Sequence, residues 1–149
     1  HQHIGLNSRL DTLQAALLRV KLRQLPAATA ARQAGAARYD AALADVPGLA
    51  IPARDPRSSH VFHQYTLQLA EPERRDNLQH FLKSCGVPTM IYYPLPAYAQ
   101  PAYAYLGYQT GQFPVAERLC RAVLSLPIHP LLTREETEYV ADRVRSYFQ

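Results

Sequence analysis

The sequence is poor in several residue types: its 149 residues include no tryptophan, one methionine, two cysteines and only two lysines beside fourteen arginines. Cys85 and Cys120 lie far apart and have no Cys-x-x-Cys partner, which favours reduced packing residues over a disulfide or a catalytic thiol. No basic run marks a nucleic-acid surface, no apolar run is as long as a membrane span, and no signal-peptide pattern is present. We therefore expect a cytoplasmic protein with neither nucleic acid nor membrane as a partner.

The remaining composition is that of a folded domain. Hydrophobic residues make up 48% of the chain and charged residues 19%, which supplies enough apolar side chain for one core and is not typical of disorder. We predict a single domain over residues 1–149. The first residue is His1 rather than methionine, and a helix is predicted to begin soon after it, so we expect the chain to be the end of a longer protein.

The segment GLNSRLDTLQAALL, residues 5–18, runs from a polar turn into an amphipathic helix. Ser8 can cap this helix, and Asp11 can answer it three residues later, as in a capping box. Four apolar residues then recur at steps of three and four and form one stripe: Leu10, Leu13, Leu17 and Val20. Free backbone N–H groups at such a terminus can bind an anion such as phosphate. An ordinary capped surface helix explains the same pattern.

Hydrophobic periodicity and turn residues predict an alternation of helices and strands. The predicted helices span 8–24, 28–44, 71–84, 114–123 and 133–148, and the predicted strands span 49–52, 60–69, 87–92 and 124–127. Gly86 is expected to end the third helix, and Thr133 with Glu136 is expected to cap the last one as a capping box. This order predicts a small α/β or α+β layer.

Two groups of polar and aromatic residues are open to more than one interpretation. His60 and His63 could form a metal pair, but at a spacing of three on a strand they face opposite sides, so we expect no metal site. Four tyrosines follow the proline-rich stretch after residue 93, and a packed dimer surface is preferred for them, because aromatic side chains are enriched at interfaces. They are Tyr98, Tyr103, Tyr105 and Tyr108.

Four separated stretches together resemble one known family. They are the NSRLD of residues 7–11 with the QAA of 14–16, the strand at 60–69 with Gln64-Tyr65, the GVPT of 86–89 leading to Tyr92-Tyr93-Pro94, and the FPVAE of 113–117 followed by the LSLP of 124–127. In this order they resemble the C-terminal half of the DegT/DnrJ/EryC1/StrS family of pyridoxal-phosphate sugar aminotransferases. The resemblance covers the whole chain. It implies the small C-terminal domain of a fold-type-I aminotransferase, with long N-terminal helices and a small, mostly antiparallel sheet flanked by helices.

The resemblance implies an enzyme activity for the intact protein. Members of this family transfer an amino group, usually from glutamate, to a keto-sugar carried by a nucleotide, and pyridoxal 5'-phosphate serves as the electron sink. The lysine that binds the cofactor belongs to an N-terminal domain that this chain lacks, and neither Lys21 nor Lys83 matches it. The resemblance therefore implies no catalytic residue in this chain, no activity for the chain alone, and a homodimer for the intact enzyme.

Four residues match family positions at the active site. Asn7 resembles the asparagine that reaches across the dimer to the cofactor phosphate, which makes it the implied cofactor-binding residue. Arg9 resembles a nearby substrate-binding arginine, whose guanidinium suits a carboxylate or a phosphate. Tyr92 and Tyr93 resemble the pair, often His-Tyr, that lines the sugar site. Because the first position of the pair is a tyrosine here, the titratable imidazole of that position is missing.

The form of these motifs is most similar to members that act on UDP-linked 3-keto-N-acetylhexosamine uronates and feed surface-polysaccharide synthesis. One alternative is a sugar dehydratase of the same family, in which a histidine replaces the catalytic lysine. A second alternative, from another class, is a free-standing, non-catalytic interaction module. The residue that separates these alternatives lies in the N-terminal domain.

Overall fold

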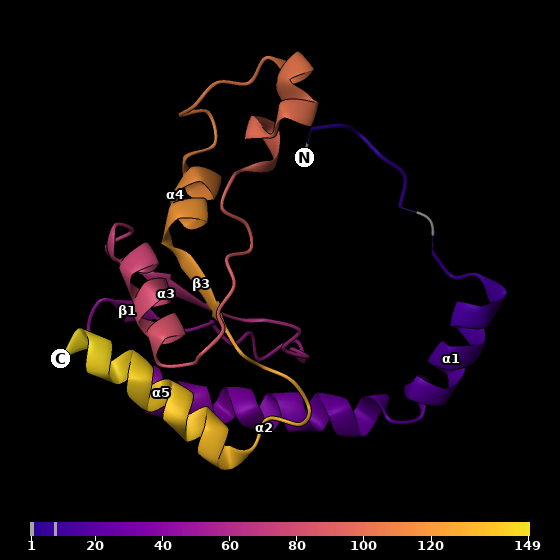
Figure 1. Cartoon of the computed structure of the whole chain (residues 1–149), viewed down its shortest axis with the longest axis vertical. Helices are drawn as coiled ribbons and strands as arrows, with labels where there is room; N and C mark the ends of the chain where they lie inside the picture. Colours follow the sequence, from indigo (N-terminus) through magenta and orange to yellow (C-terminus); the bar gives the residue numbers. More distant parts are fainter. Residues whose placement is uncertain (1, 8) are drawn as a thin grey trace.

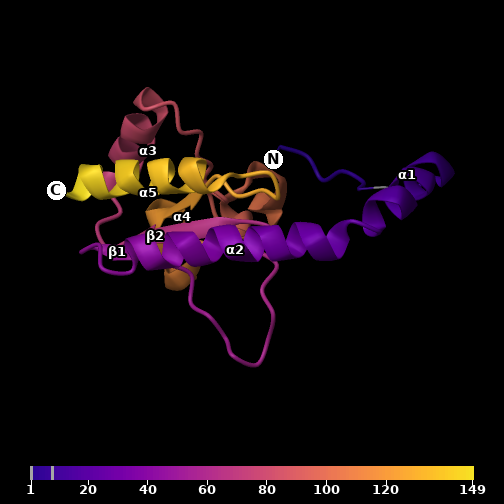
Figure 2. The same ribbon diagram turned by 90° about the horizontal axis from the view of Figure 1, so that it is seen from below.

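The structure is a computed structural model that describes residues 2–7 and 9–149. Its elements, in chain order, are α1 (Thr12–Leu22), α2 (Leu25–Leu43), β1 (Leu49–Ala50), β2 (Tyr65–Leu69), α3 (Arg74–Ser84), the 3-10 helices η1 (Ala97–Ala99) and η2 (Pro101–Leu106), α4 (Pro114–Ala122), β3 (Val123–Leu126) and α5 (Arg134–Phe148). Helices α2 and α5 run side by side in both views (Figures 1 and 2). Helix α1 and the segment before it extend away from the other elements (Figure 1).

The three strands form one antiparallel sheet in the order β1-β2-β3. Leu67 of β2 lies opposite Leu124 of β3, and Leu69 lies opposite Leu49 of β1. On the other side of β3, Met90 forms an isolated antiparallel bridge with Ser125. This mixture of helices with a small antiparallel sheet confirms the predicted fold class.

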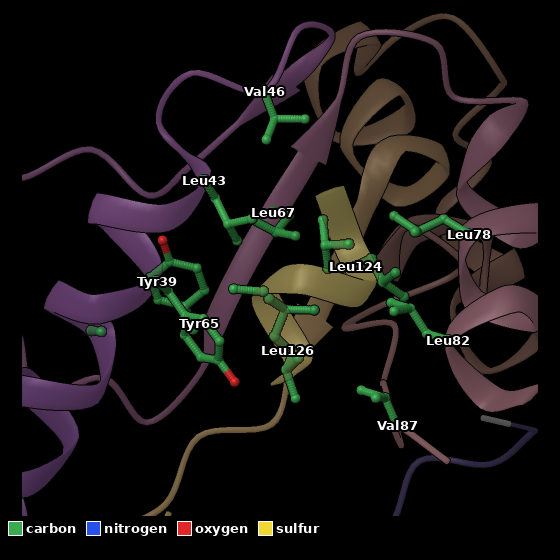
Figure 3. Packing of buried hydrophobic residues seen from close by; sticks show 14 of the residues in the cluster. Tyr39, Leu43, Val46, Tyr65, Leu67, Leu78, Leu82, Val87, Leu124 and Leu126 are labelled. Atoms are coloured by element: carbon green, nitrogen blue, oxygen red, sulfur yellow. The ribbon is translucent and has the colours of Figure 1, made fainter. Parts of the chain in front are cut away.

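The core forms where the sheet meets the helices. Side chains alternate along β2, so that Tyr65, Leu67 and Leu69 are fully or almost fully buried. Figure 3 shows Leu43 of α2 beside Leu67, and the rings of Tyr39 and Tyr65 close together. Their ring centroids are 4.9 Å apart. From α3, the side chains of Leu78 and Leu82 point toward Leu124 of β3 (Figure 3).

Two helix ends match their sequence signals. At the start of α5, the Thr133 hydroxyl accepts a hydrogen bond from the Glu136 amide, and the Glu136 carboxylate accepts one from the Thr133 amide, which confirms the predicted capping box. At the end of α3, Gly86 has a φ of +76°. The Val87 amide donates to Leu82 and the Gly86 amide to Lys83, a Schellman arrangement that confirms the predicted stop.

The start of α1 differs from its prediction. Helix α1 begins at Thr12, and Asp11 itself is the N-cap, whose carboxylate accepts a hydrogen bond from the Gln14 amide at 2.7 Å. The predicted cap Ser8 lies outside the described residues. Leu10, expected in the helical stripe, precedes the helix with a φ of +70°. Aspartate is as favourable an N-cap residue as serine, so the local sequence is compatible with a helix that starts after Ser8 or after Asp11.

The break between the first two helices also lies earlier than predicted. Helix α2 begins at Leu25, and Pro26 occupies its first turn, where a proline is tolerated because its missing N–H would have no helical partner. The prediction that α2 starts near Ala28 was therefore wrong by one helical turn.

Two predicted strands are much shorter than expected. In the predicted strand 60–69 only Tyr65–Leu69 pairs, because Phe62 takes a φ of +48° and its amide donates to the ring Nδ1 of His60 at 2.9 Å. The predicted strand 87–92 is reduced to the bridge at Met90. Both segments are loops beside the sheet rather than strands.

Helix α1 is amphipathic in sequence, yet none of its described side chains is buried. Its leucines and Val20 remain exposed together with Ile4 and Leu6 of the preceding segment. No helix in the described part of the chain is both long enough and apolar enough to span a bilayer.

Candidate functional site

Tyr92 and Tyr93 lie two and three residues after Met90, which is joined to β3 by a β-bridge. The Met90 amide donates to Ser125 O at 3.1 Å, and the Ser125 amide donates to Met90 O at 2.7 Å. The peptide bond between Tyr92 and Tyr93 is cis. Their rings meet edge to face, with centroids 5.7 Å apart. Both tyrosines are exposed, so the sheet presents two aromatic rings and two hydroxyl groups at this edge.

Tyr92 lines a small cavity of about 190 Å³, which we call the Tyr92 pocket. Three chain segments form its walls: 63–64, 88–92 and 125–128. Its lining residues are His63, Gln64, Pro88, Met90, Tyr92, Ser125, Leu126, Pro127 and Ile128. Imidazole, amide and phenol groups therefore face one cavity together with apolar side chains, a combination that can bind both the hydroxyl groups and the apolar faces of a sugar ring.

Polar side chains of α2 hold two of these walls from outside the pocket. Nη1 of Arg32 donates to Phe62 O at 3.2 Å and to Ile128 O at 3.0 Å. Nε2 of Gln33 donates to His60 O at 3.0 Å, and the Tyr39 hydroxyl donates to Pro127 O at 2.9 Å. The sequence analysis missed these residues, because their partners lie from 27 to 96 residues away and no local pattern indicates such contacts.

Asn7 and Arg9 lie on the exposed segment before α1. Nε of Arg9 donates to Oδ1 of Asn7 at 2.9 Å. This hydrogen bond fixes which end of the amide faces the guanidinium and directs the amide nitrogen, a donor, away from it. An amide N–H beside a guanidinium is a donor set that suits an anion, so these two residues fit the phosphate group of pyridoxal phosphate or of a nucleotide.

The structure places the four predicted residues in two separate pairs. The segment that carries Asn7 and Arg9 extends from α1, whereas the segment 90–93 adjoins the sheet (Figure 1). The Asn7–Arg9 contact and the Tyr92–Tyr93 contact each join neighbours in sequence. The role of each residue in binding stays a prediction.

The tyrosine-rich loop, residues 95–113, is anchored to α4 by one carboxylate. Oε1 of Glu117 accepts hydrogen bonds from the Tyr98 hydroxyl at 2.7 Å and from the amides of Gly111 and Phe113. These donors hold the pKa of Glu117 below its ordinary value, and the bond to Glu117 raises the pKa of Tyr98. The Tyr98 ring packs on Phe113 at 5.1 Å.

The outer tyrosines of this loop remain exposed. Tyr105 and Tyr108 are exposed, and the Tyr103 side chain is exposed to a smaller extent. The prediction that they form a dimer surface stays a prediction.

The described residues contain no cluster of three or more His, Cys, Asp or Glu side chains that could hold a metal ion. Cys85 and Cys120 are both free thiols, as the sequence analysis expected.

A family model matches this chain along nearly its whole length. The DegT/DnrJ/EryC1/StrS aminotransferase family is matched over residues 1–145. The chain belongs to this family.

Curated relatives of the family support the same assignment. The chain is 48% identical over 140 residues to the erythromycin biosynthesis sensory transduction protein EryC1 of Saccharopolyspora erythraea, covering 94% of this chain and 37% of the relative. It is 42% identical to the dTDP-3-amino-3,4,6-trideoxy-alpha-D-glucose transaminase of Streptomyces venezuelae, covering 99% and 38%. It is 41% identical to the UDP-2-acetamido-2-deoxy-3-oxo-D-glucuronate aminotransferase of Pseudomonas aeruginosa, covering 89% and 35%.

A solved structure of S. venezuelae DesV in complex with a ketimine intermediate shares the architecture, with a TM-score of 0.89 and 41% identity. The match covers 100% of this chain and 39% of DesV. The chain thus spans about two fifths of the length of the family members that it matches. Because the match covers the whole of this chain, the sheet, the Tyr92 pocket and α1 all lie within the part that the two proteins share.

Proposed function

We propose that the full-length protein is a pyridoxal-phosphate-dependent aminotransferase that transfers an amino group to a nucleotide-linked keto-sugar. The family match over residues 1–145 carries the proposal. It is supported by two relatives whose names specify transaminases of dTDP-linked and UDP-linked sugars. When bound, pyridoxal phosphate supplies the electron sink for this chemistry.

In this proposal the chain contributes binding groups rather than the reacting lysine. The Asn7 amide donates to the cofactor phosphate, whose main site lies on the other protomer of a homodimer, and Arg9 binds an anionic group of the substrate. Tyr92 and Tyr93 line the sugar site. Lys21 and Lys83 are exposed on α1 and α3, so we place the cofactor-binding lysine in the rest of the protein and expect the chain alone to be inactive.

For the substrate we propose a UDP-linked 3-keto-N-acetylhexosamine uronate, with glutamate as amino donor and a surface polysaccharide as the end use. The name of the P. aeruginosa relative supports this choice. A guanidinium such as that of Arg9 binds a uronate carboxylate with two parallel hydrogen bonds. The dTDP-linked sugar named for the S. venezuelae relative is the competing substrate class.

The first experiment tests the activity class on the full-length protein. Its visible spectrum is recorded with added pyridoxal phosphate before and after borohydride, and the modified peptide is identified by mass. A band that borohydride removes, with the cofactor fixed to a lysine outside residues 1–149, supports the aminotransferase. Bound cofactor without a lysine adduct would instead support the dehydratase, and no bound cofactor would support an interaction module.

The second experiment tests the substrate with a pair of acceptors. Turnover of a UDP-linked 3-keto uronate is compared with that of a dTDP-linked 3-keto-6-deoxyhexose, which carries no sugar carboxylate. If Arg9 binds the carboxylate, Arg9→Met lowers kcat/KM for the uronate by about tenfold or more and leaves the other acceptor nearly unchanged. Arg19→Met, on the exposed surface of α1, is the matched control. An equal loss on both acceptors would place Arg9 at the nucleotide phosphates and contradict the uronate proposal.

A further inference from the structure

We infer that Arg32 is a positioning residue for the Tyr92 pocket, and that it sets the affinity of the pocket for the sugar by holding two of its walls with one guanidinium nitrogen. The identity of the ligand rests on the proposed function; the positioning role rests on the contacts of Arg32 alone. Arg32 lies on α2, outside the pocket lining, and it touches no residue that was predicted to bind substrate.

The geometry of Arg32 joins two segments that are far apart in sequence. Its Nη1 donates to Phe62 O and to Ile128 O, at 3.2 and 3.0 Å. Phe62 directly precedes the wall residues His63 and Gln64, and Ile128 itself lines the pocket. An Nη1 nitrogen carries two N–H groups, so both are used, one for each wall.

The wall at 60–64 depends on such support, because its backbone is not in a relaxed conformation. Phe62 has a φ of +48° and is almost fully buried. A bulky residue adopts this left-handed region only when surrounding contacts hold it there. The polar contacts on this segment include the hydrogen bonds from Arg32 and Gln33 and the internal bond from the Phe62 amide to His60. The Phe62 ring packs in the hydrophobic core, with the Arg54 guanidinium over it at 4.0 Å.

The size of the pocket makes its shape important for binding. Its volume of about 190 Å³ is below the range of about 300–1,000 Å³ that is typical of pockets for drug-sized ligands. A whole nucleotide-sugar would extend beyond this pocket, and we assign the pocket to the sugar ring. In so small a space, a shift of one wall changes the distance from His63 or Gln64 to every sugar hydroxyl, so the predicted effect falls on substrate affinity rather than on the chemical step.

The test uses full-length protein with Arg32→Met and Arg32→Lys. We expect Arg32→Met to raise KM for the keto-sugar acceptor about tenfold or more, since at least one charge-assisted hydrogen bond is lost from a partly buried carbonyl, while kcat stays within about twofold to threefold. In the same variant, backbone amides of 60–64 and 126–129 exchange with deuterium faster than in wild type. Arg32→Lys keeps a charged donor for one carbonyl, so its KM lies between those of wild type and Arg32→Met.

The matched control is Arg38→Met on the same helix, because Arg38 is likewise half-buried, whereas the α2 hydrogen bonds to the two walls described above come from Arg32, Gln33 and Tyr39. Its KM and exchange rates should equal those of wild type. The inference is overturned if Arg32→Met leaves KM and the exchange of both segments unchanged, or if kcat falls while KM does not. Should Arg32→Met fail to fold, the KM and exchange of Arg32→Lys decide by the same criteria.

Failure of the inference and failure of the proposed function give different results. If the full-length protein transfers no amino group but Arg32→Met still speeds exchange in 60–64 and 126–129, the positioning role stands and the proposed function fails. If transfer is observed and Arg32→Met behaves as wild type, the function stands and the positioning role is rejected.

Discussion

At the scale of single residues, Tyr39 connects the core with the Tyr92 pocket. Its ring is fully buried against Tyr65, and its hydroxyl donates to Pro127 O at 2.9 Å. Burial is the main cause that raises the pKa of Tyr39, and the nearby Glu136 carboxylate adds to it. The hydroxyl therefore stays protonated and remains a donor throughout the physiological range.

Tyr39→Phe should lower the free energy of unfolding by about 1–2 kcal/mol, because it removes this hydrogen bond and leaves the Pro127 carbonyl without its donor. Urea-induced unfolding measures the change. Tyr139→Phe is the matched control, since the Tyr139 hydroxyl also donates to a backbone carbonyl, that of Cys85, at 2.9 Å but from an exposed side chain. Its cost should be within about 0.5 kcal/mol. Equal costs for the two variants would contradict the role given to burial.

The Glu117 anchor predicts how the tyrosine-rich loop responds to pH. The pKa of Glu117 is lower in the folded state than its ordinary 4.5, so its contribution is complete above that value and is lost as the pH falls through the folded pKa. The pKa of Tyr98 is raised above 10.0, so the hydroxyl contributes fully below that value and the contribution is lost as the pH rises through the folded pKa.

The near-ultraviolet circular dichroism of the tyrosines should therefore be constant between about pH 5 and 9 and change on both sides of this range. Glu117→Gln keeps an acceptor oxygen but cannot titrate, so it should abolish the change on the acid side that arises from this loop. An acid transition of unchanged midpoint and amplitude in Glu117→Gln would show that another carboxylate is responsible.

The residues of the candidate site differ in how far the sequence reveals them. The motif of Tyr92 and Tyr93 predicts a sugar-binding role, which stays a prediction, and the structure places Tyr92 on the lining of a cavity. Arg32 and Gln33 could not be found, because an arginine and a glutamine in an alanine-rich helix carry no signal for carbonyl groups that approach only in the folded chain. Local patterns indicate capping and periodicity, whereas contacts across 96 residues depend on the whole fold.

At the scale of elements, the start of α5 offers a direct test of capping. Thr133→Ala removes the hydroxyl that accepts from the Glu136 amide and should cost about 1 kcal/mol of stability. Thr133→Ser keeps the oxygen and should cost much less. Thermal unfolding compares the two variants. Helix α5 packs along α2 and contributes the buried residues Val140, Ala141 and Val144 to the core, so fraying at its N-terminus should lower the stability of the whole domain. Equal melting temperatures for wild type and Thr133→Ala would contradict the capping role.

The element predictions succeeded where a local signal was unambiguous and failed where two signals competed. Thr133 with Glu136, and Gly86 after α3, gave the helix ends directly. In the segment 60–64, the residue types favour a strand, but the bond from the Phe62 amide to His60 and the polar contacts from α2 fix a loop. Near α1, both Ser8 and Asp11 have the chemistry of a cap, and in the structure Asp11 takes this role through a local hydrogen bond from the Gln14 amide.

At the scale of the whole molecule, α1 is the element least integrated into the core. Leu13 and Leu17 are 72% and 60% exposed, and no described side chain of α1 is buried. A contiguous exposed apolar surface of this kind promotes association. We expect the isolated chain to self-associate in a concentration-dependent manner through α1.

Leu13→Glu with Leu17→Glu should shift sedimentation toward the monomer without lowering the melting temperature of the core, since neither side chain contributes to it. Leu131→Glu, at a leucine outside α1 that is even more exposed, is the control and should leave association unchanged. A drop in melting temperature for the α1 variant would show that the helix packs on the body of the molecule in solution.

Three arginines on different elements bind main-chain carbonyls far away in sequence: Arg32 binds Phe62 and Ile128, Arg75 binds Cys120 and Val123, and Arg145 binds Ala42. A bond between a cation and a carbonyl dipole in direct contact is little affected by dissolved ions, whereas attraction between exposed charges weakens as ionic strength rises. The fold is therefore expected to tolerate concentrated salt despite its net charge of +4. If salt lowers the affinity for a ligand, the cause would then be weaker attraction between exposed cationic side chains and the phosphate or carboxylate groups of the ligand, and not partial unfolding of the protein.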